Sequence, residues 1–461
     1  MNDFYNKLQF PNYRNSSTAL TINGEKGGKP VQFKLNFCEL VQSVELAGLS
    51  GLFVSDTGRG KSQLVSDITW HHFGGYDQGG RANWADGRPN FEITDLFERQ
   101  YVDLSSGSYD SDKARQLNED RIKRMLFVVD EINRAPKLKQ NEFFDLAEGK
   151  YAFKGQRLAL GTGGYCVFFA TANLNKLNGD FSGTSELDRA LLNRAHVTID
   201  MDHKDWRPTP EDKIAIRKAK ENPRLDIPAP QDISDHIIAM NKLVRADATS
   251  FSPYFQAVQF LIDEGLGYCD KDAYKDKGPV WPTKCAECDF TNKSICSAIK
   301  SSSDRTTSAI PLLATAFSHL IKLREGQDTN VDVIDAALQA FRLTTYHGNL
   351  NPIRSAEEYD NRKQLMMDQV IETLRPVTKE IGDVVANAVE GITDIITYQH
   401  PTSGSEIKAA AGKKLITGLK QRNIAYQKAN LGKNLQDYLT EHGIGSEWVP
   451  VLLDATKEAK K

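Results

Sequence analysis

The sequence lacks several features that would assign it to a specialised class of protein. No apolar run approaches the roughly 20 residues that a membrane-spanning helix needs, and the first 18 residues lack the apolar core of a signal peptide. The 461-residue chain contains only six cysteines, which does not suggest a disulfide scaffold. The formal net charge is −3, so no global excess of charge indicates nucleic acid or an acidic substrate. These absences favour a cytoplasmic protein without a membrane partner.

The length and the pattern of the chain predict several domains. A composition of 40% hydrophobic and 26% charged residues is typical of a globular protein, and 461 residues suggest two to four domains. Residues 1–30 are polar and predict an N-terminal arm, whereas 31–205 alternate strands with helices and predict a mostly parallel α/β sheet. Within that core, the polar stretch 74–120 predicts surface loops and a helix. Residues 206–352 and 353–461 are helical by pattern.

A glycine-rich loop, SDTGRGKS, occupies residues 55–62 between an apolar segment with strand character and a segment with helical spacing. In this context, backbone N–H groups and the start of the helix bind phosphate. Lys61 would reach the β- and γ-phosphates, and the hydroxyl of Ser62 would bind magnesium. Ser55 replaces the usual first glycine, and serine tolerates many turn geometries. The predicted nucleotide contacts are Ser55, Asp56, Thr57, Gly58, Arg59, Gly60, Lys61 and Ser62.

Two acidic residues follow a second apolar run. Residues 125–129 predict a buried parallel strand that ends in Asp130 and Glu131. An acid at the tip of such a strand can hold magnesium, and a neighbouring glutamate can orient a water for attack on a phosphate. We therefore predict that Asp130 helps to bind Mg²⁺ beside ATP and that Glu131 polarises the water. The alternative is a pair of acids that caps a helix.

Further segments carry a resemblance to a known family. The run DEINRAP, followed by a helix that ends in LAEGKYAFKG, resembles the MoxR family of AAA+ ATPases. The run YCVFFATANLN resembles the sensor 1 strand, which implies a catalytic role for Asn173. The run SELDRALLNRAHVTIDMD resembles the segment with the arginine finger, which implies Arg194, with Arg189 as an alternative or second arginine. The run SSSDRTTSAIPLLATAFSHLIKLREGQDTNVDVIDAAL resembles the lid, with Arg305 at the sensor 2 position.

The resemblance covers about residues 31–350 and implies a fold and an activity. The implied fold is an AAA+ parallel-sheet P-loop core, an all-helical lid over 206–352 and a helical C-terminal extension. The implied activity is hydrolysis of ATP to ADP and phosphate by a homo-oligomer, a hexameric ring in which a neighbouring subunit supplies an arginine. Such ATPases remodel or activate a partner protein or enzyme complex, and they are often paired with a von Willebrand factor A-domain protein.

Four cysteines fall in a polar insertion at about 265–300, within the predicted lid: Cys269, Cys285, Cys288 and Cys296. Polar loops seldom collect cysteines. One CxxC pair with a cysteine on each side can wrap a metal tetrahedrally, so structural zinc is the favoured interpretation. An iron–sulfur cluster and unligated thiols are the alternatives. The insertion is too short for its own core, and a metal would supply its folding energy.

Two other classes of function compete with the remodelling ATPase. A DNA-directed AAA+ motor or remodeller would use the cysteine insertion and the segment 407–435, which carries Lys and Arg but no Asp or Glu. A solvated helix face is the favoured interpretation of that segment, so nucleic acid is the less favoured partner. A nucleotide-gated scaffold that binds ATP but hardly hydrolyses it is the third hypothesis, and its motive is the altered residue Ser55.

Overall fold

The computed structural model describes residues 2–10, 18–77, 79–100, 115–173, 187–203, 206–219, 227–250, 298–299, 304–344, 350–372 and 374–375. The chain divides into two compact units. The first unit contains Met1–Asp247 and Leu312–Val331, and the second contains Ala248–Pro311 and Asp332–Lys461. The domain boundaries expected from the sequence stay predictions.

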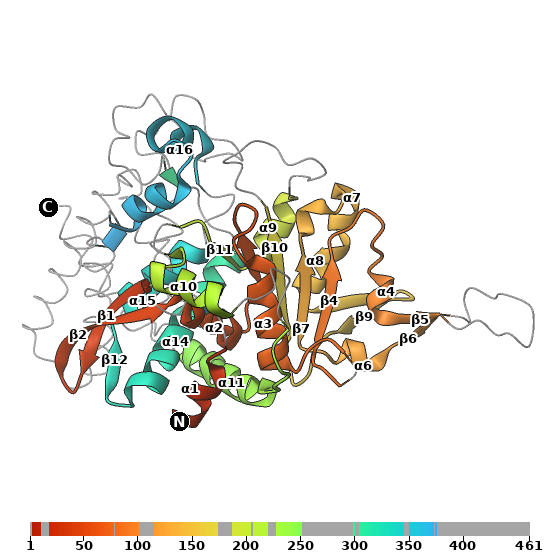
Figure 1. Ribbon diagram of the computed structural model, residues 1–461, viewed down its shortest axis with the longest axis horizontal. Coiled ribbons are helices and arrows are strands. Elements are labelled where there is room, and N and C mark those ends of the chain that lie inside the picture. The colour runs from red at the N-terminus through yellow and green to blue at the C-terminus, as the bar shows by residue number, and fades with distance from the viewer. Residues whose placement is uncertain are drawn as a thin grey trace, which may run out of the picture. The chain divides into compact units, whose positions relative to one another are not determined.

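A five-stranded parallel sheet forms the centre of the first unit (Figure 1). Each pairing in the sheet is parallel, and the spatial order is β11-β3-β10-β7-β4. The strands are β3 (Gly51–Val54), β4 (Ala82–Asp86), β7 (Leu126–Asp130), β10 (Val167–Ala172) and β11 (Val197–Asp200). β10 lies between β3 and β7. The carboxyl ends of these three strands, which precede the glycine-rich loop, Asn173 and Glu131, are therefore neighbours.

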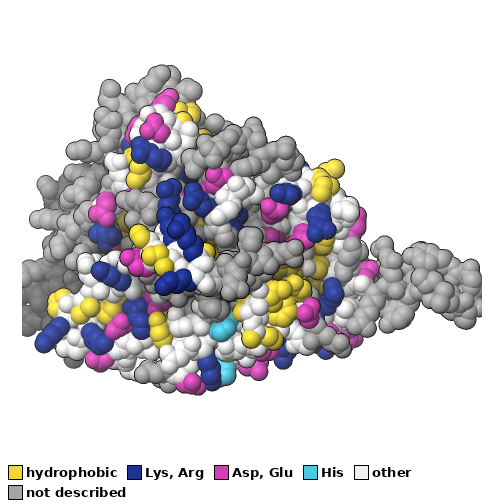
Figure 2. All heavy atoms as spheres, in the orientation of Figure 1, with side chains coloured by type: hydrophobic (Ala, Val, Ile, Leu, Met, Phe, Trp, Pro, Cys, Tyr) yellow, Lys and Arg dark blue, Asp and Glu magenta, His cyan; other side chains and the backbone are white. Residues whose placement is uncertain are grey.

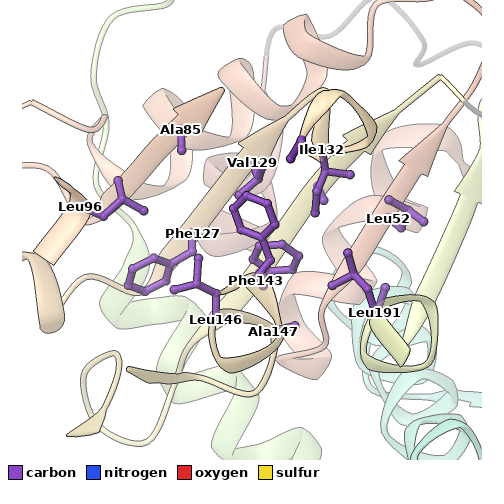
Figure 3. Packing of buried hydrophobic residues seen from close by; sticks show 14 of the residues in the cluster. Leu52, Ala85, Leu96, Phe127, Val129, Ile132, Phe143, Leu146, Ala147 and Leu191 are labelled. Atoms are coloured by element: carbon purple, nitrogen blue, oxygen red, sulfur yellow. The ribbon is translucent and has the colours of Figure 1, made fainter. Parts of the chain in front are cut away.

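Helices cover both faces of this sheet, which explains why its central strands β3, β10 and β7 are mostly apolar. In β7, Phe127 and Val129 join a buried cluster that includes Phe143 of α8 (Glu142–Ala147) (Figure 3). The alternate residues of β7 are also buried and point to the other face, where α3 (Lys61–Phe73) packs. Truncating a buried phenylalanine of this kind to alanine typically costs about 3–5 kcal/mol of stability.

The edge strand β4 corrects the prediction of surface loops over residues 74–120. β4 pairs in parallel with β7 along its whole length, and Ala82 and Ala85 are buried. Glycine pairs precede the strand, and it contains no β-branched residue, so its strand signal is weak. The other elements of this stretch are α4 (Thr94–Phe97), β5 (Glu98–Gln100), β6 (Arg115–Leu117) and α6 (Glu119–Ile122).

A second sheet joins the start of the chain to a distant segment. β1 (Thr18–Lys26) pairs antiparallel with β2 (Lys29–Asn36) and with β12 (Thr329–Val331). The residues 1–30, expected to form an arm, therefore include all of β1 and the start of β2. β12 also corrects the expectation that 206–352 is all helical, because its β-branched residues pair with β1 instead.

The remaining described elements are mostly helical. They are α1 (Asn2–Leu8), α2 (Phe37–Ala47), η1 (Ile132–Arg134), α7 (Lys137–Gln140), β8 (Lys150–Phe153), β9 (Gln156–Ala159), α9 (Arg189–Arg194), α10 (Pro210–Ala219), α11 (Ser234–Ser250), α14 (Asp304–Glu325), α15 (Val333–Thr344) and α16 (Pro352–Tyr359). Thr209 and Asp212 form reciprocal hydrogen bonds at the start of α10. That capping arrangement explains why the helix begins at Pro210.

The described surface carries both signs of charge. Figure 2 shows Lys and Arg side chains beside Asp and Glu side chains on one face. Among the described residues, the exposed large hydrophobic side chains are Val31, Leu138, Ile214, Ile227 and Leu243. No helix in the described part of the chain combines the length and the apolar character of a membrane span.

Candidate functional site

The glycine-rich loop lies between β3 and α3, and α3 begins at Lys61. Gly58 and Gly60 have φ angles of 73° and 80°, a region that glycine adopts without steric cost. A Cβ atom on either glycine would meet no atom of the described residues within 4 Å. The loop is therefore open beside these two glycines, where a ligand could approach its backbone.

The ammonium group of Lys61 lies at the centre of the site. Its Nζ atom donates to Asn173 Oδ1 at 2.6 Å, to Ser55 Oγ at 2.8 Å and to the carbonyl of Asp56 at 3.0 Å. The side chain is buried. Burial lowers the pKa of Lys61, although the surrounding carboxylates oppose that change. A buried ammonium that only neutral groups contact would be strongly attracted by a phosphate.

Ser55 takes part in this arrangement in the position usually held by glycine. Its hydroxyl accepts from Lys61 and donates to the carbonyl of Asp56 at 2.8 Å. The substitution therefore adds a hydrogen-bonding group beneath the loop and leaves the loop open. The hypothesis of a scaffold that binds ATP but hardly hydrolyses it, which the altered Ser55 suggested, stays a prediction.

Asp202, which follows β11, holds the same loop from the opposite flank. Its Oδ2 accepts from the N–H of Asp56 at 2.7 Å, and its Oδ1 lies 3.1 Å from Nε of Arg59. The N–H of Thr57 donates to the carboxylate of Asp56 at 2.7 Å. The N–H groups of Asp56 and Thr57, expected to face a phosphate, are thus engaged within the protein. The open part of the loop begins at Gly58.

A hydroxyl and a carboxylate meet beside the loop. Ser62 Oγ donates to Asp130 Oδ1 at 3.0 Å, and Thr171 Oγ1 donates to the same oxygen at 2.5 Å. Magnesium prefers hard oxygen ligands and is usually held by one or two carboxylates together with substrate phosphates. Ser62 and Asp130 therefore form a donor set that fits Mg²⁺ next to the phosphate loop.

Glu131 is held in an unusual backbone conformation. Its φ and ψ angles are 54° and 46°, in the left-handed region, where a non-glycine residue is strained. Its N–H donates to Thr171 Oγ1 at 2.8 Å, and its carboxylate lies 2.9 Å from Nε of Arg134. A Cβ atom on Gly87 would come within 2.3 Å of the carbonyl oxygen of Glu131. The glycine therefore permits the close approach of the two backbones.

Asn173 is fixed by a partner from the DEINRAP segment. The N–H of Asn173 donates to Asn133 Oδ1 at 3.3 Å, and Asn133 Nδ2 donates to the carbonyl of Asn173 at 3.1 Å. This reciprocal pair links the end of β10 to η1, which directly follows Glu131. The side chain of Asn173 remains directed to Lys61.

The structure places the predicted arginines on two helices, α9 and α14. Arg194 lies in α9, where its Nε is 2.9 Å from Glu148 Oε1 and its guanidinium lies 4.5 Å from the ring centre of Phe144. Arg189 is the first residue of α9. Arg305 is exposed near the start of α14 and belongs to the second unit. Their roles at a nucleotide stay predictions.

The cysteines of the predicted metal centre lie outside the described residues: Cys269, Cys285, Cys288 and Cys296. The described residues contain no group of three or more His, Cys, Asp or Glu side chains that could hold a metal. Neither Cys38 nor Cys166, the two described cysteines, is part of a disulfide. Burial raises the pKa of Cys166 to about 12, which makes it an inert thiol at neutral pH.

Four residues of the site were not predicted from the sequence: Gly87, Asn133, Thr171 and Asp202. Each contacts a residue that was predicted. Two of them carried a weak signal. Thr171 is the one hydroxyl in the apolar strand VFFATA, and Asp202 is the second acid after the apolar run in VTIDMD. Their partners could not be inferred, because the contacts depend on which strands are neighbours.

Comparison with known proteins gives matches among solved structures. No family model matches the sequence, and no curated protein matches it. A solved structure from Cytophaga hutchinsonii, described as a putative ATPase, is similar with a TM-score of 0.50 and 13% sequence identity. The match covers 73% of this chain and 88% of that chain. At this identity the likeness concerns the fold alone: the chain shares its overall fold with that structure.

Proposed function

We propose that this chain is an ATP-hydrolysing AAA+ ATPase, similar to the MoxR family, which remodels or activates a partner protein or enzyme complex. One observation carries the proposal. Lys61 contacts Asn173 while Ser62 contacts Asp130, at the carboxyl ends of neighbouring parallel strands. A cation, an amide, a hydroxyl and a carboxylate are thereby brought together, and phosphoryl transfer depends on such positioned charge.

The chain's own groups have distinct roles in this proposal. Lys61 neutralises the β- and γ-phosphates of ATP, and the open backbone from Gly58 onward donates to phosphate oxygens. Ser62 and Asp130 would hold Mg²⁺, which offsets phosphate charge when bound. The Glu131 carboxylate orients and polarises the attacking water. The amide of Asn173 holds that water or the γ-phosphate.

The proposed assembly is a homo-oligomeric, hexameric ring. In such a ring Arg194, with Arg189 as the alternative, acts on the nucleotide of the adjacent subunit, and Arg305 acts as the lid arginine. The support is the resemblance of these segments to the MoxR family, together with the similar fold. A von Willebrand factor A-domain protein is the proposed partner on the same ground.

The proposed four-cysteine centre would be structural. Cys269, Cys285, Cys288 and Cys296 would hold one zinc ion in a closed tetrahedron or, alternatively, an iron–sulfur cluster. Elemental analysis of protein purified without oxygen separates the choices. One zinc per chain supports the favoured form, iron with sulfide supports the alternative, and four freely alkylated thiols without metal contradict both.

The nucleotide site is tested by two substitutions. Lys61→Ala is expected to lose most of its affinity for Mg-ATP, whereas Glu131→Gln is expected to bind Mg-ATP and not hydrolyse it. Lys123→Ala and Glu119→Gln make the same changes at an exposed ion pair and serve as matched controls. Hydrolysis by Glu131→Gln at the wild-type rate would contradict the role of Glu131, and wild-type binding by Lys61→Ala would contradict the site.

The client of the ATPase is sought with the same variant. Glu131→Gln is expected to stay bound to its client in the presence of ATP, so a pull-down with and without ATP identifies proteins that bind in the ATP state. A salt-dependent DNA shift assay tests the DNA-directed alternative. The four cysteines of the insertion and the segment 407–435, which suggested this alternative, lie outside the described residues.

A further inference from the structure

We propose that Thr171 is a positioning residue. It holds the Asp130 carboxylate in place for magnesium binding and the Glu131 backbone in place for water activation. The inference rests on the proposed function. Thr171 lies in β10, the strand beside β7, which ends in Asp130.

The hydroxyl of Thr171 is used twice. It donates to Asp130 Oδ1 at 2.5 Å and accepts from the N–H of Glu131 at 2.8 Å. The residue is fully buried within β10, a strand that is otherwise apolar. A buried hydroxyl is costly unless it is bonded, so these two contacts account for its presence. One oxygen atom thus joins the proposed magnesium ligand to the backbone of the proposed water-activating residue.

The contact to Asp130 fixes how its carboxylate is turned. The register pairs Ala170 with Val129, which brings the next residue of β10 beside Asp130. Ser62 donates to the same oxygen, Oδ1, from the other side of the site. Two hydroxyls on one oxygen restrict rotation of the carboxylate, which leaves it in a set orientation for a cation. Outer partners of this kind typically account for about 10–100-fold in metal affinity or activity.

The contact to Glu131 fixes its backbone. In the left-handed region the N–H of Glu131 points to β10, where the Thr171 hydroxyl accepts it. Without that acceptor the N–H would lose its partner, and the strained conformation would lose one of the contacts that hold it. The Glu131 carboxylate would then shift relative to the position of the water. We therefore expect Thr171 to affect both the magnesium requirement and the turnover rate.

The effect of the hydroxyl is separated from that of the methyl group by comparing Thr171→Ser with Thr171→Ala. Both variants lose the methyl group, and only the serine keeps the hydroxyl. The first measurement is the Mg²⁺ concentration that gives half-maximal binding of a fluorescent ADP analogue. We expect that concentration to rise about 10-fold or more in Thr171→Ala and to stay near the wild-type value in Thr171→Ser. Turnover of ATP at saturating Mg²⁺ should fall in the alanine variant alone.

The controls separate positioning from general stability. Thr198→Ala makes the same change at a buried threonine of β11 in the same sheet, and its Mg²⁺ requirement should equal that of the wild type. If Thr171→Ala does not fold, Thr171→Val replaces it and fills the space. Equal Mg²⁺ requirements for the serine and the hydroxyl-free variants would overturn the inference, even with a lower melting temperature. A wild-type chain that shows no Mg²⁺-dependent nucleotide binding would instead overturn the proposed function.

Discussion

Nζ of Lys61 lies 2.6 Å from Oδ1 of Asn173, although 112 positions separate the two residues in the chain. The contact exists because β10 lies directly beside β3, so the end of β10 meets the loop that follows β3. An amide oxygen is a neutral acceptor, so this contact does not itself neutralise the positive charge of Lys61. The pair is thus suited to release the lysine to a phosphate.

Nucleotide affinity is expected to fall as the pH rises into the alkaline range. The fall should occur at a lower pH than the titration of an exposed lysine. Burial lowers the pKa of Lys61, so the ammonium loses its proton as the pH rises through that lowered value. Phosphate binds the charged form, and deprotonation therefore weakens binding. The dissociation constant of Mg-ADP, measured from about pH 7 to about pH 10.4, the ordinary lysine value, checks this. Lys61→Arg keeps its charge and should lack the change. A flat wild-type profile over that range would contradict the prediction.

Gly87→Ala is expected to reduce ATP turnover more than it reduces Mg-ATP binding. The new Cβ would lie 2.3 Å from the carbonyl oxygen of Glu131, so the backbone at Glu131 must move. Gly80→Ala is the matched control, because its Cβ would lie 2.1 Å from the carbonyl oxygen of Gly75, before β4. Both variants should melt at lower temperature, and only Gly87→Ala should lose turnover. Equal turnover in the two folded variants would show that Gly87 does not position Glu131.

The strands that carry the site were predictable, and the edges of the fold were not. Buried strands such as β7 and β10 are continuous apolar runs, and the polar residues that follow them mark the carboxyl edge of the sheet. β4 was missed because an edge strand needs fewer apolar residues and this one follows glycine-rich turns. β12 was missed because three residues of strand depend on their pairing with β1.

The loop, the acid pair and Asn173 could be predicted because each has a local sequence pattern. Their supporting contacts could not. Thr171 and Asp202 act across strands, so their partners follow from the order of the sheet and the register of each pair. The sequence also could not show that Arg194 is bound to Glu148 within its own chain.

Arg194 is expected to act on the nucleotide of a neighbouring subunit. Because its guanidinium is paired with Glu148 and lies over Phe144 in the single chain, that action requires exchange of these contacts in the ring. Arg194→Ala should lower the turnover of the assembled ring by about 10³-fold or more. Mixing Arg194→Ala subunits with Lys61→Ala subunits should restore part of the activity. Rings that form from the mixture and stay inactive would contradict action in trans, and Arg189→Ala then tests the alternative arginine.

A buried histidine joins the helix that follows the loop to α2 by an ion pair and to the start of the chain by a hydrogen bond. His72, in the last turn of α3, lies with Nδ1 2.7 Å from Glu45 Oε2 and with Nε2 2.8 Å from the carbonyl of Leu8. Both ring nitrogens face acceptors, which favours the doubly protonated ring. Burial opposes that charge, but the carboxylate of Glu45 and the two hydrogen bonds outweigh it and raise the pKa of His72.

The stability of the first unit is therefore expected to depend on the charge of His72. A histidine whose pKa is raised by folding stabilises fully below its unfolded value of about 6.5 and loses that contribution as the pH rises through the folded value. His72→Gln should remove this part of the pH dependence. It should also lower the unfolding free energy by about 3–5 kcal/mol, because it leaves Glu45 buried without its partner. Denaturant unfolding between about pH 5 and pH 9 measures both effects, a range that spans the unfolded histidine value. His71→Gln, on the same helix, is the control, since burial lowers the pKa of His71. Equal pH profiles for the wild type and His72→Gln would show that folding leaves the pKa of His72 unchanged and would contradict the prediction.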